Sequence, residues 1–354
     1  MMTNNFTPDY RNLENAARNI EVSRTPLYEH SIAHGIIEKL TGKSLQIAGE
    51  TPSELDNFFV NYNGFFKDFG YDTVTFELCI TTVLPGGGAL GGQVDPVIKT
   101  REDFERYPFG DIPRIYFEQY GKYFDALERN LPDGMKAVGG VGNGVFEIAQ
   151  DLTGYENLML MSYDDPELYA QLFAEVGDMM TSIWAEFMRR HSGAYCVLRF
   201  GDDLGYKSNT LLPHDDIIRR IIPQYRRVTD IVHSYGKPFL LHSCGCIFDV
   251  FDEIIEGAKI DAKHSNEDAI SPFSEWVNRY GGRIGNFGGI DTDHVCRMKD
   301  DGIKRLVKET MDYCAKDRGG FAIGTGNSIP DYADPGAYAA MVEAVREYRG
   351  DFKR

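Results

Sequence analysis

The sequence predicts an α/β protein whose strands close into one (βα)8 TIM barrel. Eight short apolar or β-branched runs recur along the 354 residues, and helical patterns lie between most of them. This repeated strand–helix alternation fits a closed parallel barrel better than an open sheet. The 42% hydrophobic content and the lack of a linker-like or low-complexity tract fit a single large domain.

The expected strands are short, and most of them end on a polar side chain. They are TPLYEH (25–30), DTVTFELC (72–79), MKAVGGVG (135–142), YCVLRFGDD (195–203), KPFLLHSC (237–244), IDAKHSN (260–266), GRIGNFGG (282–289) and GFAIGTGN (320–327).

Helices are expected where apolar residues recur at three- and four-residue steps. The pattern over 165–190 starts at Asp165 and Pro166, and the pattern over 214–236 is interrupted by Pro223. Two shorter helices are expected over 247–257 and 301–317. Residues 1–24 are predicted to form a helical arm and residues 25–354 the barrel, with residues 85–135 covering one mouth as a loop and helices.

Charge and targeting features limit the classes of partner. The net charge of −17, from 54 acidic and 37 basic residues, opposes binding to nucleic-acid backbones. No secretory h-region begins the chain and no apolar run could span a bilayer, so a cytoplasmic protein without a membrane partner is expected. The amphipathic stretch over 9–20 could pack on its own barrel or on a second copy, which leaves a homodimer open.

Polar side chains gather at the predicted strand ends, which is where active sites of such barrels lie. They are Glu29, His30, Glu77, Cys79, Asn143, Asp202, Asp203, His242, Cys244, His264, Glu267, Asp268, Asn286, Asp291 and Asn327. So many hydrogen-bonding or ligating groups converging on one mouth favour an enzyme over a structural protein.

His242 and Cys244 are the sharpest feature, because residues two apart on a strand share one face. Imidazole and thiolate together are good zinc ligands. The plainer interpretation is a buried histidine bonded to a carbonyl beside an inert thiol. A catalytic zinc needs about three protein ligands. The third is not obvious from the residues, and Cys79, Glu77, Glu29 and His30 are all candidates.

Two further strand ends could take part in chemistry. Adjacent aspartates on an extended chain point in opposite directions, so one of Asp202 and Asp203 is expected to face the pocket. It could take a proton, hold a ligand histidine or bind substrate, or merely cap loop amides. His264 ends its strand with the same ambiguity.

Several stretches together resemble the uroporphyrinogen decarboxylase superfamily. They include FGYDTVTFELC, FGDDLGYKSNTLLPHDD, LLHSCG, DAKHSNED, GNFGGIDT and GGFAIGTGNSIP, and the similarity covers nearly the whole chain beyond residue 20. The resemblance implies a βα barrel with its site at the strand ends. One branch of the superfamily decarboxylates a tetrapyrrole without metal. Another, which includes methylcobamide:coenzyme M methyltransferases, binds zinc through a His-x-Cys pair and a later cysteine.

The chain resembles the methyltransferase branch more than the decarboxylase branch. His242 and Cys244 match the zinc pair, although Asn327 or Gly326 stands where the later cysteine is expected. The arginine-rich stretch of the decarboxylases is absent, and TPLYEHSIAHG (25–35) stands there with Glu29 and His30.

The function expected from the resemblance is therefore a zinc-dependent methyltransferase. It would move a methyl group between a small molecule and a methylcobamide carried by a partner corrinoid protein. The expected zinc ligands are His242, Cys244 and Cys79, the expected catalytic residues are Asp203, His264 and Glu77, and the expected substrate-binding residues are Glu29, His30, Asn143 and Asn327. The alternatives are a metal-free decarboxylase of a tetrapyrrole or smaller acid, and a barrel that binds a ligand without chemistry.

Overall fold

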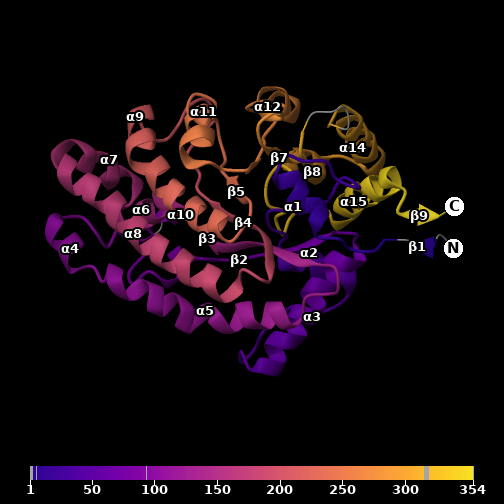
Figure 1. Cartoon of the computed structure of the whole chain (residues 1–354), viewed down its shortest axis with the longest axis horizontal. Coiled ribbons are helices and arrows are strands. Elements are labelled where there is room, and N and C mark those ends of the chain that lie inside the picture. Colours follow the sequence, from indigo (N-terminus) through magenta and orange to yellow (C-terminus); the bar gives the residue numbers. More distant parts are fainter. Residues whose placement is uncertain (1–2, 5, 93, 315–318, 354) are drawn as a thin grey trace.

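Seven parallel strands form a curled sheet at the centre of the computed structural model, which describes residues 3–4, 6–92, 94–314 and 319–353 (Figure 1). They pair in chain order, and each strand overlaps one of the last seven predicted runs. The strands are β2 (Thr73–Cys79), β3 (Lys136–Gly142), β4 (Tyr195–Gly201), β5 (Phe239–His242), β6 (Ala262–His264), β7 (Gly285–Ile290) and β8 (Phe321–Thr325).

The prediction of an eighth strand over 25–30 is wrong, and the sheet is not closed by a continuous ladder. This segment lies beside β8 but makes one isolated bridge to it, between Leu27 and Ile323. Beyond that bridge, side chains take the place of backbone groups. The carboxylate of Glu29 accepts the backbone N–H of Thr325, and the hydroxyl of Thr75 in β2 donates to the Glu29 carbonyl at 2.7 Å. The segment thus joins β8 to β2 without forming a regular strand.

The buried carboxyl group of Glu29 makes a stability prediction possible. Burial raises its pKa from 4.5 to about 8, against the hydrogen bonds from Thr325 and Tyr71 that lower it. Because this pKa is higher in the folded state than in the unfolded state, the contribution of Glu29 to the free energy of unfolding is complete below pH 4.5. It is lost as the pH rises towards 8.

We expect Glu29→Gln to remove this pH dependence. Between pH 5.5 and 7.5, the free energy of unfolding of the wild type should fall relative to the variant by up to about 1.4 kcal/mol per pH unit, the value for one linked proton. Urea unfolding of both proteins in a chelator at three pH values measures this difference. Parallel stability curves would show that Glu29 ionises normally in the folded protein.

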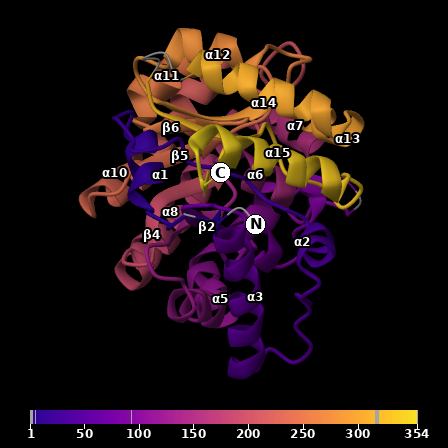
Figure 2. The ribbon, with the colours of Figure 1, turned by 90° about the vertical axis from the view of Figure 1, so that its right-hand side faces the viewer.

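Helices surround the sheet and connect its strands (Figures 1 and 2). They are α1 (Arg11–Ala17), α2 (His34–Thr41), α3 (Pro52–Asp68), α4 (Arg101–Arg106), α5 (Ile112–Arg129), α6 (Val145–Thr153), α7 (Tyr155–Asp164), α8 (Pro166–His191), α9 (His214–Asp216), α10 (Ile222–Ser234), α11 (Phe251–Glu253), α12 (Phe273–Tyr280), α13 (Thr292–Arg297), α14 (Asp300–Cys314) and α15 (Pro335–Arg349). π-helical turns at Ile217–Ile221 and Ile254–Ala258 adjoin α10 and α11. The first of these explains the interruption expected near Pro223, which lies in the first turn of α10.

The predicted N-terminal arm contains α1, which packs against β4, β7 and β8 at the amino ends of the strands. Two close backbone contacts fix it there. A Cβ atom at Gly285 or Gly320, next to the starts of β7 and β8, would lie 2.4 or 1.9 Å from the carbonyl oxygen of Ala16. The helix therefore covers the end of the sheet opposite to the one that carries the polar strand ends.

The two ends of the described chain lie side by side (Figure 1). β1 (Thr3–Asn4) pairs antiparallel with β9 (Phe352–Lys353). None of the helices within the described ranges has an apolar stretch of the length that crossing a bilayer requires.

Candidate metal centre

Strand register brings His242 and His264 together at the carboxyl end of the sheet. His242 in β5 is paired with Gly201 of β4 on one side and with His264 of β6 on the other. The two imidazoles are buried, and their Nδ1 atoms lie 2.7 Å apart. One proton must therefore lie between these two nitrogens.

The position of that proton follows from the far side of His264. Its Nε2 lies 2.9 Å from the backbone oxygen of Thr325, which can only accept, so this nitrogen carries a proton. Burial lowers the pKa of His264 to about 3 and that of His242 well below its usual range, so both rings are neutral at pH 7. Nδ1 of His264 is then an acceptor, and Nδ1 of His242 donates to it.

This arrangement leaves Nε2 of His242 without a proton and with its lone pair available. It lies 3.3 Å from Sγ of Cys244 and 3.8 Å from Oδ1 of Asp203. A neutral histidine that donates its other N–H to a fixed acceptor is the form found in metal sites.

The loop after β5 holds Cys244 against the loop after β4. The backbone N–H of Cys244 donates to Oδ1 of Asp203 at 2.8 Å. Gly245 follows with φ of +81°, and a Cβ atom there would lie 2.1 Å from the carbonyl carbon of Gly205. Only glycine permits two loops to pass at this distance, so the backbone of this turn sets the position of the thiol.

The three donor atoms fit a zinc ion. Tetrahedral zinc with one thiolate at about 2.3 Å and one imidazole at about 2.1 Å separates their donor atoms by about 3.6 Å. The sulfur–nitrogen separation of 3.3 Å is close to this value, and the nitrogen–oxygen separation of 3.8 Å exceeds by a few tenths of an ångström the ~3.4 Å that zinc sets for such a pair. One donor atom from each of Asp203, His242 and Cys244 lies within 4.8 Å of the others. Three protein ligands leave one position free, as in catalytic zinc sites.

A second trio, His30, His242 and His264, also brings one ring nitrogen each within 4.8 Å. It fits a metal less well, because the His242–His264 hydrogen bond uses the two facing nitrogens. The ring of His30 instead stacks on His242, with the ring centroids 3.7 Å apart. Its buried Nδ1 has no hydrogen-bond partner among the described residues.

The sulfur of Cys244 receives two further donors. The amide Nδ2 of Asn327 lies 3.3 Å from it and the hydroxyl of Ser265 lies 3.6 Å from it. Oδ1 of Asn327 accepts from the backbone of Ser328 at 2.8 Å, which fixes the amide with its nitrogen towards the sulfur. Burial, and after it the charge of Asp203, raise the pKa of the free thiol to about 12, so metal binding would release its proton.

The structure does not bring Cys79 or Glu77 to this cluster, so neither is placed as the third ligand expected from the sequence. Among the described residues, neither belongs to a group of at least three histidine, cysteine or acidic side chains whose donor atoms all lie within 4.8 Å of one another. Glu77 instead forms an ion pair of 2.6 Å with the buried guanidinium of Arg199.

Two predicted substrate-binding residues are likewise engaged elsewhere. Glu29 is fully buried against Thr325 and Tyr71 and does not line the cavity described below. Asn143 accepts from the hydroxyl of Thr81 at 2.9 Å and donates to Glu147 at 2.8 Å. Among the predicted catalytic and substrate-binding residues, Asp203, His264, His30 and Asn327 therefore gather at the His242–Cys244 pair.

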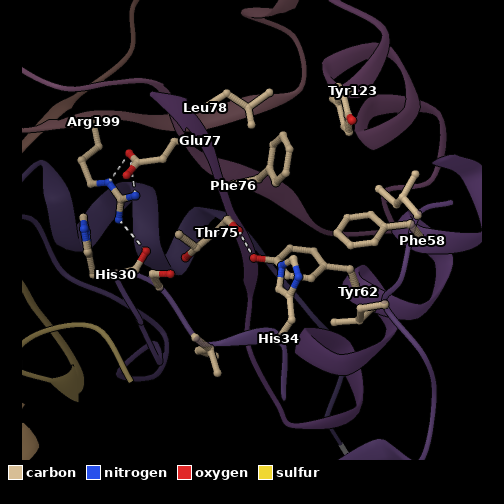
Figure 3. A pocket seen from close by; sticks show the side chains of 14 residues that line it. His30, His34, Phe58, Tyr62, Thr75, Phe76, Glu77, Leu78, Tyr123 and Arg199 are labelled. Atoms are coloured by element: carbon tan, nitrogen blue, oxygen red, sulfur yellow. Dashed lines mark hydrogen bonds and ion pairs between the residues drawn. The ribbon is translucent and has the colours of Figure 1, made fainter. Parts of the chain in front are cut away.

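A cavity of about 410 Å³ adjoins the cluster through His30, whose ring stacks on His242. Figure 3 shows His30 among the residues that line this cavity. Its walls come from the 30–34 segment, residues 45–47, α3, β2, α5 and β4. A small molecule bound there would lie beside the cluster of Asp203, His242 and Cys244.

A family model described as uroporphyrinogen decarboxylase (URO-D) matches residues 59–348, which is most of the chain. The chain belongs to the uroporphyrinogen decarboxylase family. No curated protein matches it by sequence.

Several solved structures are similar to this family member along most of the chain. A methyltransferase from Methanosarcina mazei is similar with a TM-score of 0.69 and 16% sequence identity, over 95% of this chain and 98% of that chain. A D-allulose 3-epimerase from Methylomonas sp. has a TM-score of 0.40 and 11% identity, over 92% and 99%. A GH5_18 protein from Streptomyces cattleya in complex with GlcNAc has a TM-score of 0.46 and 12% identity, over 92% and 81%. At 16% identity, the similarity to the methyltransferase shows the fold alone.

Sequence reasoning on this family member missed groups that have no motif. The Thr325 carbonyl is a backbone group, which no motif reports. Ser265 directly follows His264, the last residue of β6, and a single serine at a strand end has no distinctive pattern. Arg199 lies inside an apolar strand, where an unpaired charge is rare. Its place in the middle of YCVLRFG was the one available signal that a partner carboxylate had to lie nearby.

Proposed function

We propose that this chain is a zinc-dependent methyltransferase, which moves a methyl group between a small substrate and a cobamide carried by a corrinoid protein. The observation that carries the proposal is the hydrogen-bond chain from the Thr325 carbonyl through His264 to His242. It leaves an unprotonated nitrogen facing a thiol and a carboxylate at separations suited to zinc. The similar fold of a protein named as a methyltransferase supports the same class.

Asp203, His242 and Cys244 would hold the ion. Bound zinc would supply a Lewis acid that polarises the heteroatom carrying or receiving the methyl group. In the direction towards the cobamide, the bond between the methyl carbon and the heteroatom breaks. The bonding pair stays on the heteroatom, which takes one proton from solvent. The methyl carbon bonds to cobalt(I) through the electron pair of the metal, which thereby becomes cobalt(III).

The other residues of the cluster position these groups. His264 fixes the tautomer of His242, and Asn327 and Ser265 direct hydrogen-bond donors at the sulfur of Cys244. Such donors stabilise negative charge on the sulfur. Asp203 is half-exposed, with 44% of its side chain accessible, so it has room to exchange its contact with the Cys244 amide for a bond to the ion.

Methyl transfer can be tested with free cobalamin before the corrinoid partner is known. We expect the zinc-supplied protein to convert cob(I)alamin to methylcobalamin with a member of a panel of methyl ethers, methyl thioethers and methylamines, followed by absorbance. A chelator should abolish the reaction, and zinc should restore it. The proposal would be contradicted if no donor transferred a methyl group to cob(I)alamin and if methylcobalamin transferred none to small thiols.

Uroporphyrinogen is not expected to be a substrate. A tetrapyrrole with several carboxylates needs cationic partners, and Arg199, the arginine that lines the cavity, is already paired with Glu77. Glu29 is not among the residues that line the cavity, so its charge plays no part in this expectation. Anaerobic incubation with uroporphyrinogen should release no carbon dioxide above background. Efficient release would show that the decarboxylase alternative is correct.

A further inference from the structure

We propose that the cavity beside the cluster holds the body of the methyl-bearing substrate, and that this substrate is an uncharged molecule built on an aromatic ring. The inference rests on the proposed methyl transfer and adds the class of substrate to it. Three properties of the cavity carry it: the chemistry of its walls, the balance of its charges and the state of one histidine.

Apolar and aromatic side chains form most of the walls. The cavity volume of about 410 Å³ lies in the usual range for small-molecule sites, ~300–1,000 Å³. These side chains are Ile32, Leu45, Ile47, Phe58, Tyr62, Phe76, Leu78 and Tyr123. Figure 3 shows the aromatic rings of Phe58, Tyr62, Phe76 and Tyr123 on the side away from Arg199. Flat, apolar walls of this kind favour an aromatic ring, which can pack edge-to-face or offset against them.

The one arginine in the lining offers no free charge to an anion. Its Nε lies 3.0 Å from the Glu77 carboxylate and its Nη2 lies 2.6 Å from it. Its Nη1 donates to the hydroxyl of Tyr28 at 2.7 Å and to the backbone oxygen of His30 at 3.0 Å. A carboxylate or sulfonate entering the cavity would have to break this pair or remain uncompensated, and either costs free energy.

Two histidines also line the cavity. Burial lowers the pKa of His34, so its ring is neutral at pH 7, and the ring of His30 is stacked on His242. Within the described part of the lining no other cationic side chain is present. An uncharged substrate therefore enters without the free-energy cost of burying an unpaired charge.

His34 supplies a polar contact for such a ring. It begins α2 and packs against Phe58 and Tyr62, with ring centroids 5.5 and 5.9 Å away. The Tyr62 hydroxyl is occupied, since it donates to the backbone oxygen of Thr75 at 2.7 Å. The ring contacts of His34 are with these two aromatic side chains, and neither of its nitrogens makes a side-chain hydrogen bond within the described chain, so this neutral imidazole can bind a hydroxyl or carbonyl substituent on a ring.

A matched pair of probes separates charge from shape. 4-Methoxybenzamide and 4-methoxybenzoate have the same ring and nearly the same outline, but only the second is an anion. We expect calorimetry on the zinc-supplied full chain to show the amide binding at least about tenfold more tightly, or about 1.4 kcal/mol. Equal or tighter binding of the benzoate, or no binding of either up to millimolar concentration, would overturn the proposal.

Two variants place the probe in this cavity. Glu77→Gln should shift the preference towards the benzoate, because it leaves the charge of Arg199 uncompensated. If that variant does not fold by circular dichroism, Ile47→Trp tests the site by filling it, and amide binding should weaken at least fivefold. Val60→Trp is the matched control, since Val60 lies on the exposed face of α3 with 55% of its surface accessible. An equal effect of both tryptophans would place the probe elsewhere.

The outcomes for the ring and for methyl transfer are distinguishable. Tight binding of the amide without methyl transfer from any donor would leave the cavity assignment intact and contradict the proposed reaction. Methyl transfer from an anionic or aliphatic donor, with no binding of the amide, would support the proposed reaction and contradict the cavity assignment.

Discussion

Replacing Cys244 by alanine is expected to abolish zinc binding and to lower methyl transfer at least about 100-fold while the chain stays folded. Removing the sulfur leaves His242 and Asp203 as protein ligands, too few to retain zinc during purification. The sulfur is not a core packing element, since its neighbours are polar groups of Asn327, Ser265 and His242. Metal analysis, circular dichroism and the cobalamin assay on the same preparation check the three parts of this prediction.

Cys246→Ala and Cys79→Ala are the matched controls. Cys246 belongs to the turn, where its backbone N–H donates to the oxygen of Tyr206 at 2.6 Å. Cys79 ends β2, which is not a neighbour of β5 in the sheet. Both variants should keep about one zinc per chain. Loss of zinc in Cys79→Ala, with retention in Cys244→Ala, would reverse our choice of ligands.

His264→Phe should weaken zinc binding by about 10- to 100-fold, the usual effect of losing the group that orients a ligand histidine. The phenyl ring fills a similar space beside Tyr28, 5.3 Å away between ring centroids, but it cannot accept the N–H of His242. His242 is then free to adopt the other tautomer, which places a proton where the metal should bind.

His264→Gln distinguishes a positioning role from simple packing. A glutamine oxygen can accept from His242, so this variant should recover most of the zinc affinity that His264→Phe loses. Competition with a zinc-sensitive chelator measures both affinities. Equal affinities for the two variants would mean that the acceptor at this position does not matter, and that the hydrogen-bond chain is not what prepares His242.

Much of the fold follows from local sequence patterns. Each of the seven strands from β2 to β8 lies on a predicted run, because apolar runs between helical patterns have few other structures available. The run over 25–30 has the same pattern but does not form a ladder. The reason lies in tertiary contacts, because the side chain of Glu29 accepts the backbone N–H of Thr325. The local sequence around Glu29 does not indicate this contact.

The candidate site was predictable to the extent that single strands determine it. The two-residue spacing placed His242 and Cys244 on one face, and the strand end placed Asp203 at the same mouth. The partners across strands were not predictable, because they depend on register. Pairing of β5 with β6 puts His264 beside His242, whereas β2 does not pair with β5, so register does not bring Cys79 to this site.

The departure at Asn327 has a physical explanation that the resemblance alone could not supply. A cysteine was expected near this position as the third ligand. The structure instead has an amide that donates to the Cys244 sulfur, and Asp203 supplies a third donor from the adjacent strand end. Replacing a thiolate by a carboxylate leaves the ligand set harder and with the same charge, which should still select zinc but bind it less tightly.

X-ray absorption at the zinc edge of the zinc-loaded wild type tests the central claim most directly. We expect about one zinc per chain, with one sulfur near 2.3 Å and nitrogen or oxygen ligands near 2.0–2.2 Å. The sulfur signal should persist in Cys79→Ala and Cys246→Ala protein, whereas Cys244→Ala protein should hold no stoichiometric zinc after the same loading. A shell without sulfur in the wild type, or the absence of stoichiometric zinc after loading, would contradict a metal centre at Asp203, His242 and Cys244.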